Sequence, residues 1–283
     1  LDVIYGVSPP TTAIFTAFWI ARLSNLPLVV DFKDERIGTQ YFKNCPRFIQ
    51  ALYKMLERCI VKKAHTVITA TPSSYENFLR RYSDIPHDKF SFIPNGADVQ
   101  EFIQFASAAV RSSDENSKRK FIILNAGGYS PIYRNARSFL KALNNLLETR
   151  PDLREIIQVR FIGQGAKLAY GDLVVRLGNV FIEEPPLSRS EYISALCQAD
   201  LLLLIQTLGY PSSIAGTFYE YWAAGRAPIL IIGEPGDMWN LLHAHRLGFA
   251  LRHDDVDGIR STIEMLVDKH LAGQPMRISV DGI

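Results

Sequence analysis

Short apolar runs alternate with helical patterns along most of the chain. The apolar runs predict buried strands at residues 3–5, 28–30, 66–70 and 90–93, and again at 121–124, 157–162, 179–182, 201–205, 228–232 and 248–251. Between them, apolar residues recur at helical spacing over residues 11–24, 46–63 and 72–82, and further on over 135–149, 189–198, 215–224, 236–246 and 255–269. This alternation predicts an α/β fold in which helices cover the faces of a parallel sheet.

The alternation stops once, near the middle of the chain. Pro94-Asn95-Gly96 is a turn signal, and residues 104–120 are polar and charged, so they have little apolar surface to bury. We therefore predict a first Rossmann-like, doubly wound domain at 1–103, a linker at 104–120 and a second such domain at 121–283. Ligands of these folds bind at the carboxyl ends of the strands, which would line a cleft between the two domains.

Composition excludes several classes of function. The chain has 283 residues, 47% of them hydrophobic, which is enough for two cores. Its 31 Lys and Arg against 29 Asp and Glu leave a charge of +2, which argues against a nucleic-acid partner. The three cysteines have no zinc-ligand spacing, so we expect no metal site and a reducing compartment. Without a signal peptide or an uncharged apolar run of about 18 residues, the sequence predicts a cytoplasmic protein.

Two glycine-containing loops of the second domain follow predicted strands. Gly127 and Gly128 would let the backbone approach a ligand, and Arg134 could contact a phosphate. A tight turn with a solvated arginine explains the same residues equally well. Gly163 begins a second glycine pair that lacks the full spacing of a dinucleotide motif, so it fits either a simple turn or close approach to a nucleotide base.

A third loop leads into the helix predicted at 215–224. The small residues at 212–217 would leave the first backbone N–H groups of this helix free to face an anion. Glu220 could accept hydrogen bonds from two ribose hydroxyls, or simply complement the helix dipole. The residues alone leave both interpretations open.

In the first domain, a charged loop follows the strand predicted at 28–30. Residues 31–35 (DFKDE) hold four charges at the carboxyl end of a strand, so Lys33 and Asp34 would face the predicted cleft. Charges of a solvated loop are the alternative explanation.

Four stretches resemble motifs of retaining glycosyltransferases of the GT-B fold, glycosyltransferase family 4, and its bacterial polysaccharide-assembly members most of all. They are 2–10 (DVIYGVSPP), 28–34 (LVVDFKD), 64–72 (AHTVITATP) with 93–98 (IPNGAD), and 216–230 (GTFYEYWAAGRAPIL). The resemblance covers nearly the whole chain and implies two Rossmann-like domains that face a cleft. It also implies that residues before Leu1 complete the first domain, because the chain enters a strand pattern directly.

The resemblance implies transfer of a sugar from a UDP- or GDP-linked donor to a glycan or lipid-linked acceptor, with retention of anomeric configuration and without a metal or other cofactor. The donor would bind residues that match the family's motifs, namely Gly127, Gly128, Gly163, Ala215, Gly216, Thr217, Phe218 and Glu220. Glu220 would hold the ribose hydroxyls. The catalytic positions would be Lys33 and Asp34 beside the cleft, and Arg134 at the leaving diphosphate.

Two departures from the family pattern support an alternative. Ser212 stands where an acidic residue is usual, and Thr217 stands where a lysine usually contacts phosphate. The second hypothesis is therefore a catalytically inactive GT-B protein that acts as a nucleotide-binding or scaffold subunit. A sugar-nucleotide epimerase is the third, and it would need further acidic and histidine residues in the cleft.

A lipid-linked acceptor would lie at the inner face of the cytoplasmic membrane. Five basic residues of the first domain could form a face that docks on anionic lipid: Arg58, Lys62, Lys63, Arg80 and Arg81. Ordinary solvated helix faces would explain the same residues, so peripheral membrane contact stays open.

Overall fold

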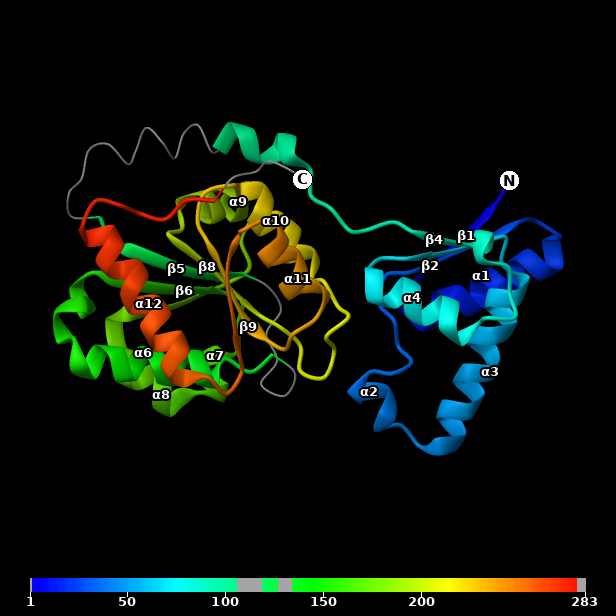
Figure 1. The fold of residues 1–283 in the computed structure, drawn as a ribbon, viewed down its shortest axis with the longest axis horizontal. Coiled ribbons are helices and arrows are strands. Elements are labelled where there is room, and N and C mark those ends of the chain that lie inside the picture. The colour runs from blue at the N-terminus through cyan, green and yellow to red at the C-terminus, as the bar shows by residue number, and fades with distance from the viewer. Residues whose placement is uncertain (1, 106–118, 127–133, 279–283) are drawn as a thin grey trace. The chain divides into compact units, whose positions relative to one another are not determined.

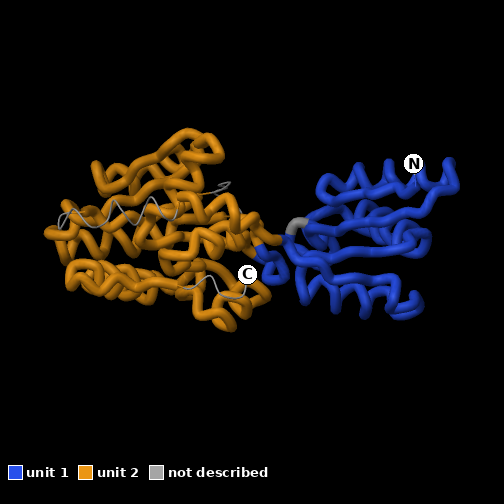
Figure 2. Tube along the Cα trace, turned by 90° about the horizontal axis from the view of Figure 1, so that it is seen from above, with its two compact units in different colours: residues 1–95, 209–214 blue, residues 96–208, 215–283 orange. Residues whose placement is uncertain are grey.

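The computed structural model describes residues 2–105, 119–126 and 134–278. Within these ranges the chain forms two compact units, each built around its own parallel sheet (Figure 2). Unit 1 comprises residues 1–95 and 209–214, and unit 2 comprises residues 96–208 and 215–283. None of the helices in the described ranges has the length and the apolar run that crossing a bilayer requires.

The sheet of unit 1 has four parallel strands in the same order as along the chain: β1 (Ile4–Ser8), β2 (Leu28–Phe32), β3 (Thr66–Thr69) and β4 (Phe90–Phe92). Its helices are α1 (Thr11–Ser24), α2 (Gln40–Lys43), α3 (Arg47–Lys63) and α4 (Pro72–Arg81), with a 3₁₀ turn η1 (His87–Lys89). Each strand is followed by its neighbour in the sheet, always in the same direction, and right-handed crossovers of this kind place all connecting helices on one face of the sheet. Accordingly, α1, α3 and α4 cover one face of this sheet (Figure 1).

One core fills the space between this face and its helices. Phe32 of β2, Phe78 of α4 and Phe90 of β4 are each at most 4% exposed, and the rings of Phe32 and Phe78 lie 4.9 Å apart. Gly6 lets α1 approach β1 closely, because a Cβ at Gly6 would lie 2.7 Å from that of Ala17. The apolar periods of the sequence therefore give unit 1 a core of its own.

The sheet of unit 2 has six parallel strands in the order β10-β9-β8-β5-β6-β7. They are β5 (Phe121–Ala126), β6 (Ile157–Ile162), β7 (Phe181–Glu184), β8 (Leu201–Ile205), β9 (Ile229–Gly233) and β10 (Gly248–Arg252). The helices are α6 (Arg137–Thr149), α7 (Ala166–Ala169), α8 (Gly171–Leu177), α9 (Arg189–Gln198), α10 (Gly216–Ala224), α11 (Asp237–Ala244) and α12 (Val256–Leu271), with η2 (Pro151–Glu155) and η3 (Gly178–Val180).

Helices cover both faces of this second sheet. The chain advances in opposite directions on the two sides of the sheet, so right-handed crossovers place α6 and α8 on one face and α10 and α11 on the other. The helix α12 returns to pack beside α6, and α9 lies beside α10 (Figure 1). The core between β5, β6 and β8 and the helices α6 and α12 includes Phe139, Val159, Leu203 and Ile263, all fully buried.

All ten predicted strands and the eight predicted helices are present at their predicted places. The sequence pattern missed the short helices α2, α7 and α8 and a helical segment at 99–105. These segments are too short for a helical period to show, and tertiary contacts hold them. The Tyr170 hydroxyl between α7 and α8, for example, accepts a hydrogen bond from the Ala136 N–H group at 2.9 Å.

The two units divide differently from the predicted domains. The division falls between Asn95 and Gly96, before the predicted end of the first domain at 103, because Phe102 is 1% exposed and packs in unit 2 beside Arg189 of α9. Most of the predicted linker, residues 106–118, lies outside the described residues. The segment 209–214 groups with unit 1, an exchange that the sequence did not indicate.

Candidate functional site

The strand order of the second sheet reverses between β5 and β8. From β5 the chain moves outward through β6 to β7, and from β8 it moves the other way through β9 to β10. The loops after β5 and β8 therefore diverge at the carboxyl end of the sheet, which is where ligands of such sheets bind. The loop after β5 includes the predicted site residues Gly127 and Gly128, which lie outside the described residues.

Tyr221 of α10 ties these two strands together at that end. Its buried hydroxyl accepts a hydrogen bond from the Ala126 N–H group at 2.8 Å and lies 3.2 Å from the carbonyl oxygens of Ala126 and Leu203. Burial raises the pKa of the Tyr221 hydroxyl, so it keeps its proton as a donor. The Asn125 amide adds a hydrogen bond to the Leu203 carbonyl at 2.9 Å. The scaffold under the predicted ligand position is thus fixed by buried hydrogen bonds.

The helix α10 begins at the same end without a side-chain cap. Its N-cap residue is Ala215, and its first turn has no acidic residue, so no carboxylate of its own meets the first N–H groups. Gly216 is exposed, and a Cβ added there would meet no described atom within 4 Å, so neither packing nor a left-handed backbone requires glycine. Phe218 is fully buried, which leaves only its backbone to face a ligand. The helix start can therefore accept an anion close to its backbone.

Glu220 lies one turn into α10, and both of its carboxylate oxygens accept hydrogen bonds from α9. Arg189 donates to Oε1 at 2.5 Å, and the Tyr192 hydroxyl donates to Oε2 at 2.6 Å. Glu220 keeps 23% of its side chain exposed, and a carboxylate oxygen can accept a second hydrogen bond. The carboxylate is therefore held in a defined orientation by α9.

Arg189 and Tyr192 are site residues that the sequence analysis missed. Arg189 also donates from Nε and Nη2 to Glu101, at 3.1 and 2.6 Å, and these hydrogen bonds with Glu101 and then Glu220 raise its pKa. Burial, followed by the hydrogen bond to Glu220, raises the pKa of Tyr192. The only local signal was a capping box at the start of α9, in which Ser188 and Glu191 cap each other, and this fixes the helix start without indicating its partner.

Arg134 lies at the expected end of the sheet. Its Nε atom is 3.3 Å from the Thr207 hydroxyl oxygen, which joins the residues that follow β5 to the loop that follows β8. Thr217, at the second position of α10, is partly exposed at the same helix start. The predicted residues Arg134, Gly216, Thr217 and Glu220 thus all lie in unit 2 around the point where the strand order reverses.

The turn at Gly163 is occupied by the protein's own carboxylate. Gly163 and Gly165 have φ values of +123° and +115°, which favour glycine and identify a turn. The Glu183 carboxylate accepts hydrogen bonds from the Gly165 and Ala166 N–H groups at 2.6 and 2.7 Å. The interpretation as a simple turn accounts for these glycines, and a contact between Gly163 and a nucleotide base stays a prediction.

In unit 1, the charged residues of 31–35, at the carboxyl end of β2, are largely internal. Asp31 is 1% exposed, and its Oδ2 atom accepts a hydrogen bond from the Tyr5 hydroxyl at 2.6 Å and pairs with Lys33 Nζ at 3.0 Å. The hydrogen bond to Asp31 raises the pKa of Tyr5 to about 12. Asp34 is exposed at the strand end, whereas Glu35 is 4% exposed. The sequence did not distinguish between these four charged residues. In the structure, Asp31 and Glu35 are buried and structural, whereas Asp34 is accessible.

Glu35 belongs to a buried ionic cluster around Arg81. Arg81 pairs with Glu35 and, at 3.1 Å, with Glu57, and Asn77 donates to Glu35 at 2.9 Å. Tyr82 donates to Glu57 at 2.6 Å. Burial raises the pKa of the Glu57 carboxyl, against the hydrogen bond from Tyr82 and the charge of Arg81. Arg81 therefore does not belong to the solvated basic face that the sequence suggested.

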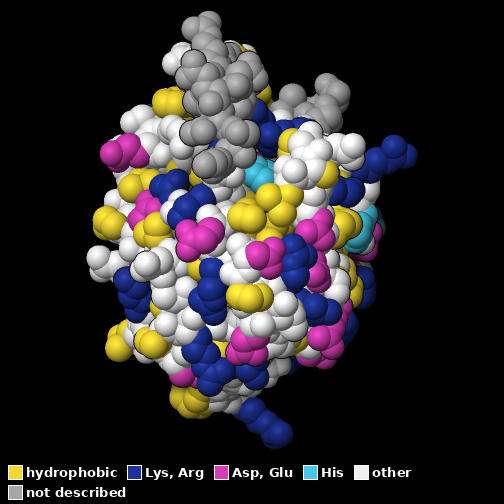
Figure 3. Space-filling model, turned by 90° about the vertical axis from the view of Figure 1, so that its left-hand side faces the viewer, with side chains coloured by type: hydrophobic (Ala, Val, Ile, Leu, Met, Phe, Trp, Pro, Cys, Tyr) yellow, Lys and Arg dark blue, Asp and Glu magenta, His cyan; other side chains and the backbone are white. Residues whose placement is uncertain are grey.

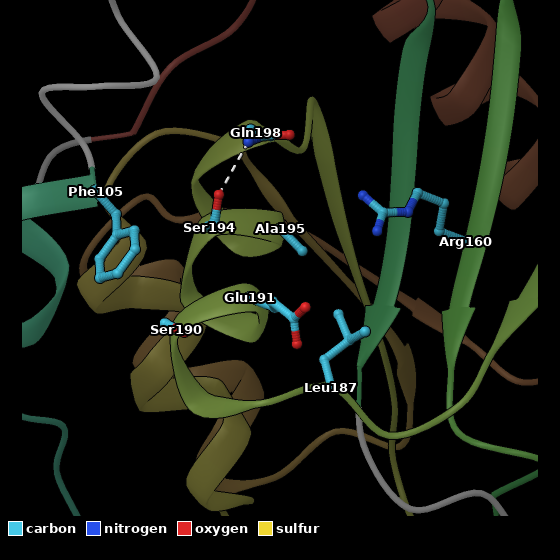
Figure 4. Close-up of a pocket in the computed structure, with 8 residues that line it drawn as sticks. All are labelled: Phe105, Arg160, Leu187, Ser190, Glu191, Ser194, Ala195 and Gln198. Carbon is cyan, nitrogen blue, oxygen red and sulfur yellow. Dashed lines mark hydrogen bonds between the residues drawn. The ribbon is translucent and has the colours of Figure 1, made fainter.

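A pocket of about 430 Å³ lies beside α9 (Figure 4). Arg160 of β6 lines it, but Glu184 neutralises this guanidinium through hydrogen bonds of 2.6 and 2.8 Å. Glu191, on the opposite wall, is committed to the Ser188 hydroxyl and N–H group. The charged groups of this pocket are satisfied locally, and none of the predicted site residues lines it. Elsewhere in the described residues, no cluster of three His, Cys, Asp or Glu side chains could hold a metal ion.

A protein-family model matches about the first third of the chain. Residues 1–96 match the model of a family described as Glycosyl transferase 4-like domain. No curated protein sequence matches the chain significantly.

Solved structures resemble the chain over nearly its whole length. They include HepE from Anabaena in complex with UDP and glucose, with a TM-score of 0.64 and 15% identity, covering 99% of this chain and 74% of that one. WaaG, a glycosyltransferase involved in lipopolysaccharide biosynthesis, has a TM-score of 0.65 and 14% identity, covering 94% and 77%. Sucrose-phosphate synthase from Thermosynechococcus elongatus has a TM-score of 0.63 and 16% identity, covering 97% and 66%. Identities this low establish the fold alone. The chain has the GT-B fold of glycosyltransferases, with two parallel-sheet domains, as its motifs predicted.

Proposed function

We propose that this chain is a glycosyltransferase that moves a sugar from a nucleotide-diphosphate donor to a glycan or lipid-linked acceptor. The observation that carries the proposal is the uncapped start of α10, with Glu220 one turn further on, at the strand ends where the sheet order reverses. The GT-B fold and the family match over residues 1–96 support this class of reaction. UDP and UDP-glucose, bound to HepE in its structures, favour a uridine nucleotide in the donor.

The proposed reaction follows from the charge that develops on the donor. The bond between the anomeric carbon and the diphosphate breaks, and the acceptor oxygen bonds to the same face of that carbon, so the configuration is retained. The acceptor proton passes to the leaving diphosphate. The first N–H groups of α10 and the Arg134 guanidinium would stabilise the diphosphate charge without a metal ion. Gly127, Gly128 and Gly163 would approach the donor, and Lys33 and Asp34 would face the acceptor.

The place of the reaction is part of the proposal. A lipid-linked or glycan acceptor in polysaccharide assembly would be reached from the cytoplasm, with peripheral contact at the inner face of the cytoplasmic membrane. If N–H groups and arginine neutralise the charge of the donor without a metal ion, a chelator should leave the transfer rate unchanged.

A panel of nucleotides tests the donor site. UDP, GDP, ADP and CMP are added to the chain and to Glu220→Ala, and thermal unfolding is followed. A ligand at about 100 times its dissociation constant adds about 2.7 kcal/mol to the free energy of unfolding. We expect UDP to stabilise the parent chain and to lose this effect in Glu220→Ala. A cooperative melt that no nucleotide shifts would contradict a donor site.

A second candidate, a GT-B protein that binds nucleotide without transfer, has an observation in its favour. Both Glu220 oxygens already accept hydrogen bonds from α9, and Ser212 and Thr217 stand in place of charged residues that the family's motifs carry. Transfer or hydrolysis of UDP-glucose distinguishes the two. NMR of the released or transferred sugar would show the α-anomer for the proposed enzyme, whereas tight UDP binding without turnover would favour the second candidate.

A further inference from the structure

Three neighbouring strands of unit 2 begin beside one another at the edge of the sheet opposite to the candidate site. Arg119 precedes β5, Asp200 precedes β8 and Arg226 precedes β9, and these three strands are adjacent in the sheet. The strand β8 is five residues long, so this amino edge lies about 16 Å from the carboxyl edge that holds the candidate site. The two edges are therefore separate surfaces of unit 2.

The last described segment of the chain returns to this amino edge. His270, in the last turn of α12, places its Nε2 atom 3.2 Å from the Arg119 carbonyl oxygen. The C-terminal end of α12 accordingly lies beside the start of β5 (Figure 1). Further on, the Ile278 N–H group donates a hydrogen bond to the Arg226 carbonyl oxygen at 3.1 Å. Arg277, which precedes Ile278, is thereby brought to the same edge.

The carboxylate at this edge is already committed. Asp200 is 5% exposed, and its Oδ2 atom accepts a hydrogen bond from the Ile122 N–H group at 3.0 Å and pairs with Arg119 Nη2 at 3.3 Å. Arg119, Arg226 and Arg277 carry one positive charge each, and Asp200 carries one negative charge. The three arginines therefore leave a surplus of two positive charges at the amino edge.

Arg226 and Arg277 have no carboxylate of their own in the described part of the chain. Arg226 Nη1 is buried without a hydrogen-bond partner among these residues. Arg277 is exposed, yet partial burial of its guanidinium, and then the charge of Arg226, lower its pKa. Asp200 acts against this shift and Arg119 adds to it. Partly desolvated cations beside one another cost free energy, and an anion placed between them would remove that cost.

The surplus of positive charge is local. Figure 3 views unit 2 from the side of this edge and shows basic and acidic side chains intermixed over much of that face. Two other partly buried arginines of unit 2 have carboxylate partners, Arg150 with Asp152 at 3.0 Å and Arg160 with Glu184 at 2.6 Å. The arginines without a partner therefore indicate a site for one anion rather than a generally basic surface.

We propose that Arg119, Arg226 and Arg277 bind a phosphate group at the amino edge of unit 2. A phosphate group carries about 1.5 to 2 negative charges at pH 7, which matches the surplus, whereas a carboxylate or chloride would compensate half of it. Each planar guanidinium can donate two hydrogen bonds to phosphate oxygens. This site is distinct from the donor site at the start of α10, and the proposal does not rest on the proposed function.

Titration calorimetry of the full chain with inorganic phosphate, in chloride at constant ionic strength, tests the proposal. We expect Arg277→Gln to bind phosphate at least about tenfold more weakly, because it removes charge-assisted hydrogen bonds. The matched control is Arg176→Gln, which removes another exposed arginine of unit 2 and is expected to bind like the parent. No binding by the parent, or equal affinity of Arg277→Gln and the control, would overturn the proposal.

A variant of α10 distinguishes the two anion sites of unit 2. Gly216→Ala changes the helix start and leaves the amino edge intact, so it should retain phosphate binding at that edge. Phosphate binding that is lost in Gly216→Ala and kept in Arg277→Gln would place the anion at α10 and overturn the proposal. A parent that binds phosphate through Arg277 but binds no UDP would support the amino-edge site and contradict the proposed donor site.

Thermal unfolding separates a ligand site from a structural role of Arg226. Arg226→Met removes a partly buried cation that has no described partner, so without phosphate the melting temperature should stay the same or rise. The rise in melting temperature that phosphate causes in the parent should be lost. A lower melting temperature in Arg226→Met, together with a phosphate-induced rise equal to that of the parent, would overturn the proposal.

Further probes identify the source of the phosphate group. Inorganic phosphate, pyrophosphate and glucose 6-phosphate share the required chemistry, and the probe that binds most tightly through Arg277 indicates the source. Acetate that binds as tightly as these probes would overturn a site for phosphate. The other possible occupant is a carboxylate of the chain, and Asp281 is the first acidic residue after Arg277 in the sequence. Phosphate binding that appears only in Asp281→Asn would identify that carboxylate as the occupant and overturn the proposal.

Discussion

Arg189 joins two carboxylates that lie far apart in the sequence. Its guanidinium contacts Glu220 on one side and Glu101 on the other, and it lies 5.8 and 5.6 Å from the ring centres of Phe102 and Tyr192. With 47% of its side chain exposed, Arg189 contributes little to stability through these pairs. Its effect should instead appear in how well Glu220 is oriented toward a ligand.

Replacing Arg189 tests this orientation. In Arg189→Ala, the Glu220 carboxylate gains rotational freedom that a bound ribose must remove, so we expect about fivefold to tenfold weaker UDP binding. Unfolding free energy should change by less than about 1 kcal/mol. Titration calorimetry with UDP and 2′-deoxy-UDP measures the effect, since the preference for the 2′-hydroxyl should fall as well.

A matched variant completes that measurement. Arg252→Ala removes another exposed arginine of unit 2, which pairs only weakly with Asp254 at 3.6 Å, and should leave UDP binding unchanged. If Arg189→Ala retained the full preference for the 2′-hydroxyl, Arg189 would have no part in positioning Glu220.

The buried cluster around Arg81 gives the opposite case, a charge that matters for stability. Arg81→Ala leaves Glu35 and Glu57 buried without a cation, so we expect unfolding free energy to fall by about 3–5 kcal/mol at neutral pH. Burial raises the pKa of Glu57, so the native state binds protons more tightly than the unfolded chain does. The free energy of unfolding that Arg81→Ala loses at neutral pH should therefore be partly regained as the pH falls. Urea denaturation at pH 7 and pH 5 measures both effects.

The neighbouring residue supplies the control for this prediction. Arg80 has the same chemistry on the same helix but is exposed, so Arg80→Ala should change unfolding free energy by less than about 0.5 kcal/mol. A loss in Arg81→Ala that grew as pH fell would show that the two glutamates are not buried as charged groups.

At the level of the element, α10 combines rigidity with an open start. Tyr221 anchors the helix to β5 and β8, and Phe218 fixes it in the core, while Gly216 and Thr217 stay accessible. A helix held in this way keeps its first N–H groups in place before a ligand arrives. An anion therefore meets preorganised donors at the helix start.

Gly216→Ala probes this helix start directly. The added methyl group meets no described atom within 4 Å, so the melting temperature should stay within about 2 °C of the parent's or rise slightly. A diphosphate against the backbone would be displaced, and we expect UDP affinity to fall at least about tenfold, or about 1.4 kcal/mol. Gly171→Ala is the matched control, because Gly171 also begins a helix and also has open space beside it. Equal UDP affinity in both variants would contradict ligand contact at α10.

At the level of the whole molecule, each unit has its own sheet and its own core. The core of unit 1 is built on β1–β4, and the core of unit 2 on the second sheet with α6 and α12. A ligand that binds one unit therefore stabilises mainly the elements of that unit.

Hydrogen exchange tests this partition of the ligand's effect. We expect saturating UDP to slow exchange in α10 and at residues 206–208 after β8, and to leave β1–β3 unchanged. The Glu220→Ala variant should lose the protection in α10. Protection by UDP confined to unit 1 would place the nucleotide site in the wrong unit and contradict the proposed function.

The sequence by itself determined the kinds of element and their order, and it predicted which residues form the candidate site. Short apolar runs located all ten strands, because strands of a parallel sheet are buried on both faces, and the helical period of 3.6 residues located the longer helices. Arg134, Gly216, Thr217 and Glu220 were predicted because loops after parallel strands meet at one edge, and the structure brings them to that edge. The GT-B fold followed from the motifs.

Only the tertiary structure decided which of these residues are held and by what. Arg189 and Glu220 are 31 residues apart, and Arg81 and Glu35 are 46 apart, so no local pattern marks either pair. Burial made Asp31 and Glu35 structural and left Asp34 exposed, although all three lie within five residues of the sequence. The grouping of 209–214 with unit 1 likewise depends on how segments pack against a sheet. Such contacts depend on which elements the fold brings together, and the local sequence pattern of an element does not identify the elements that pack against it.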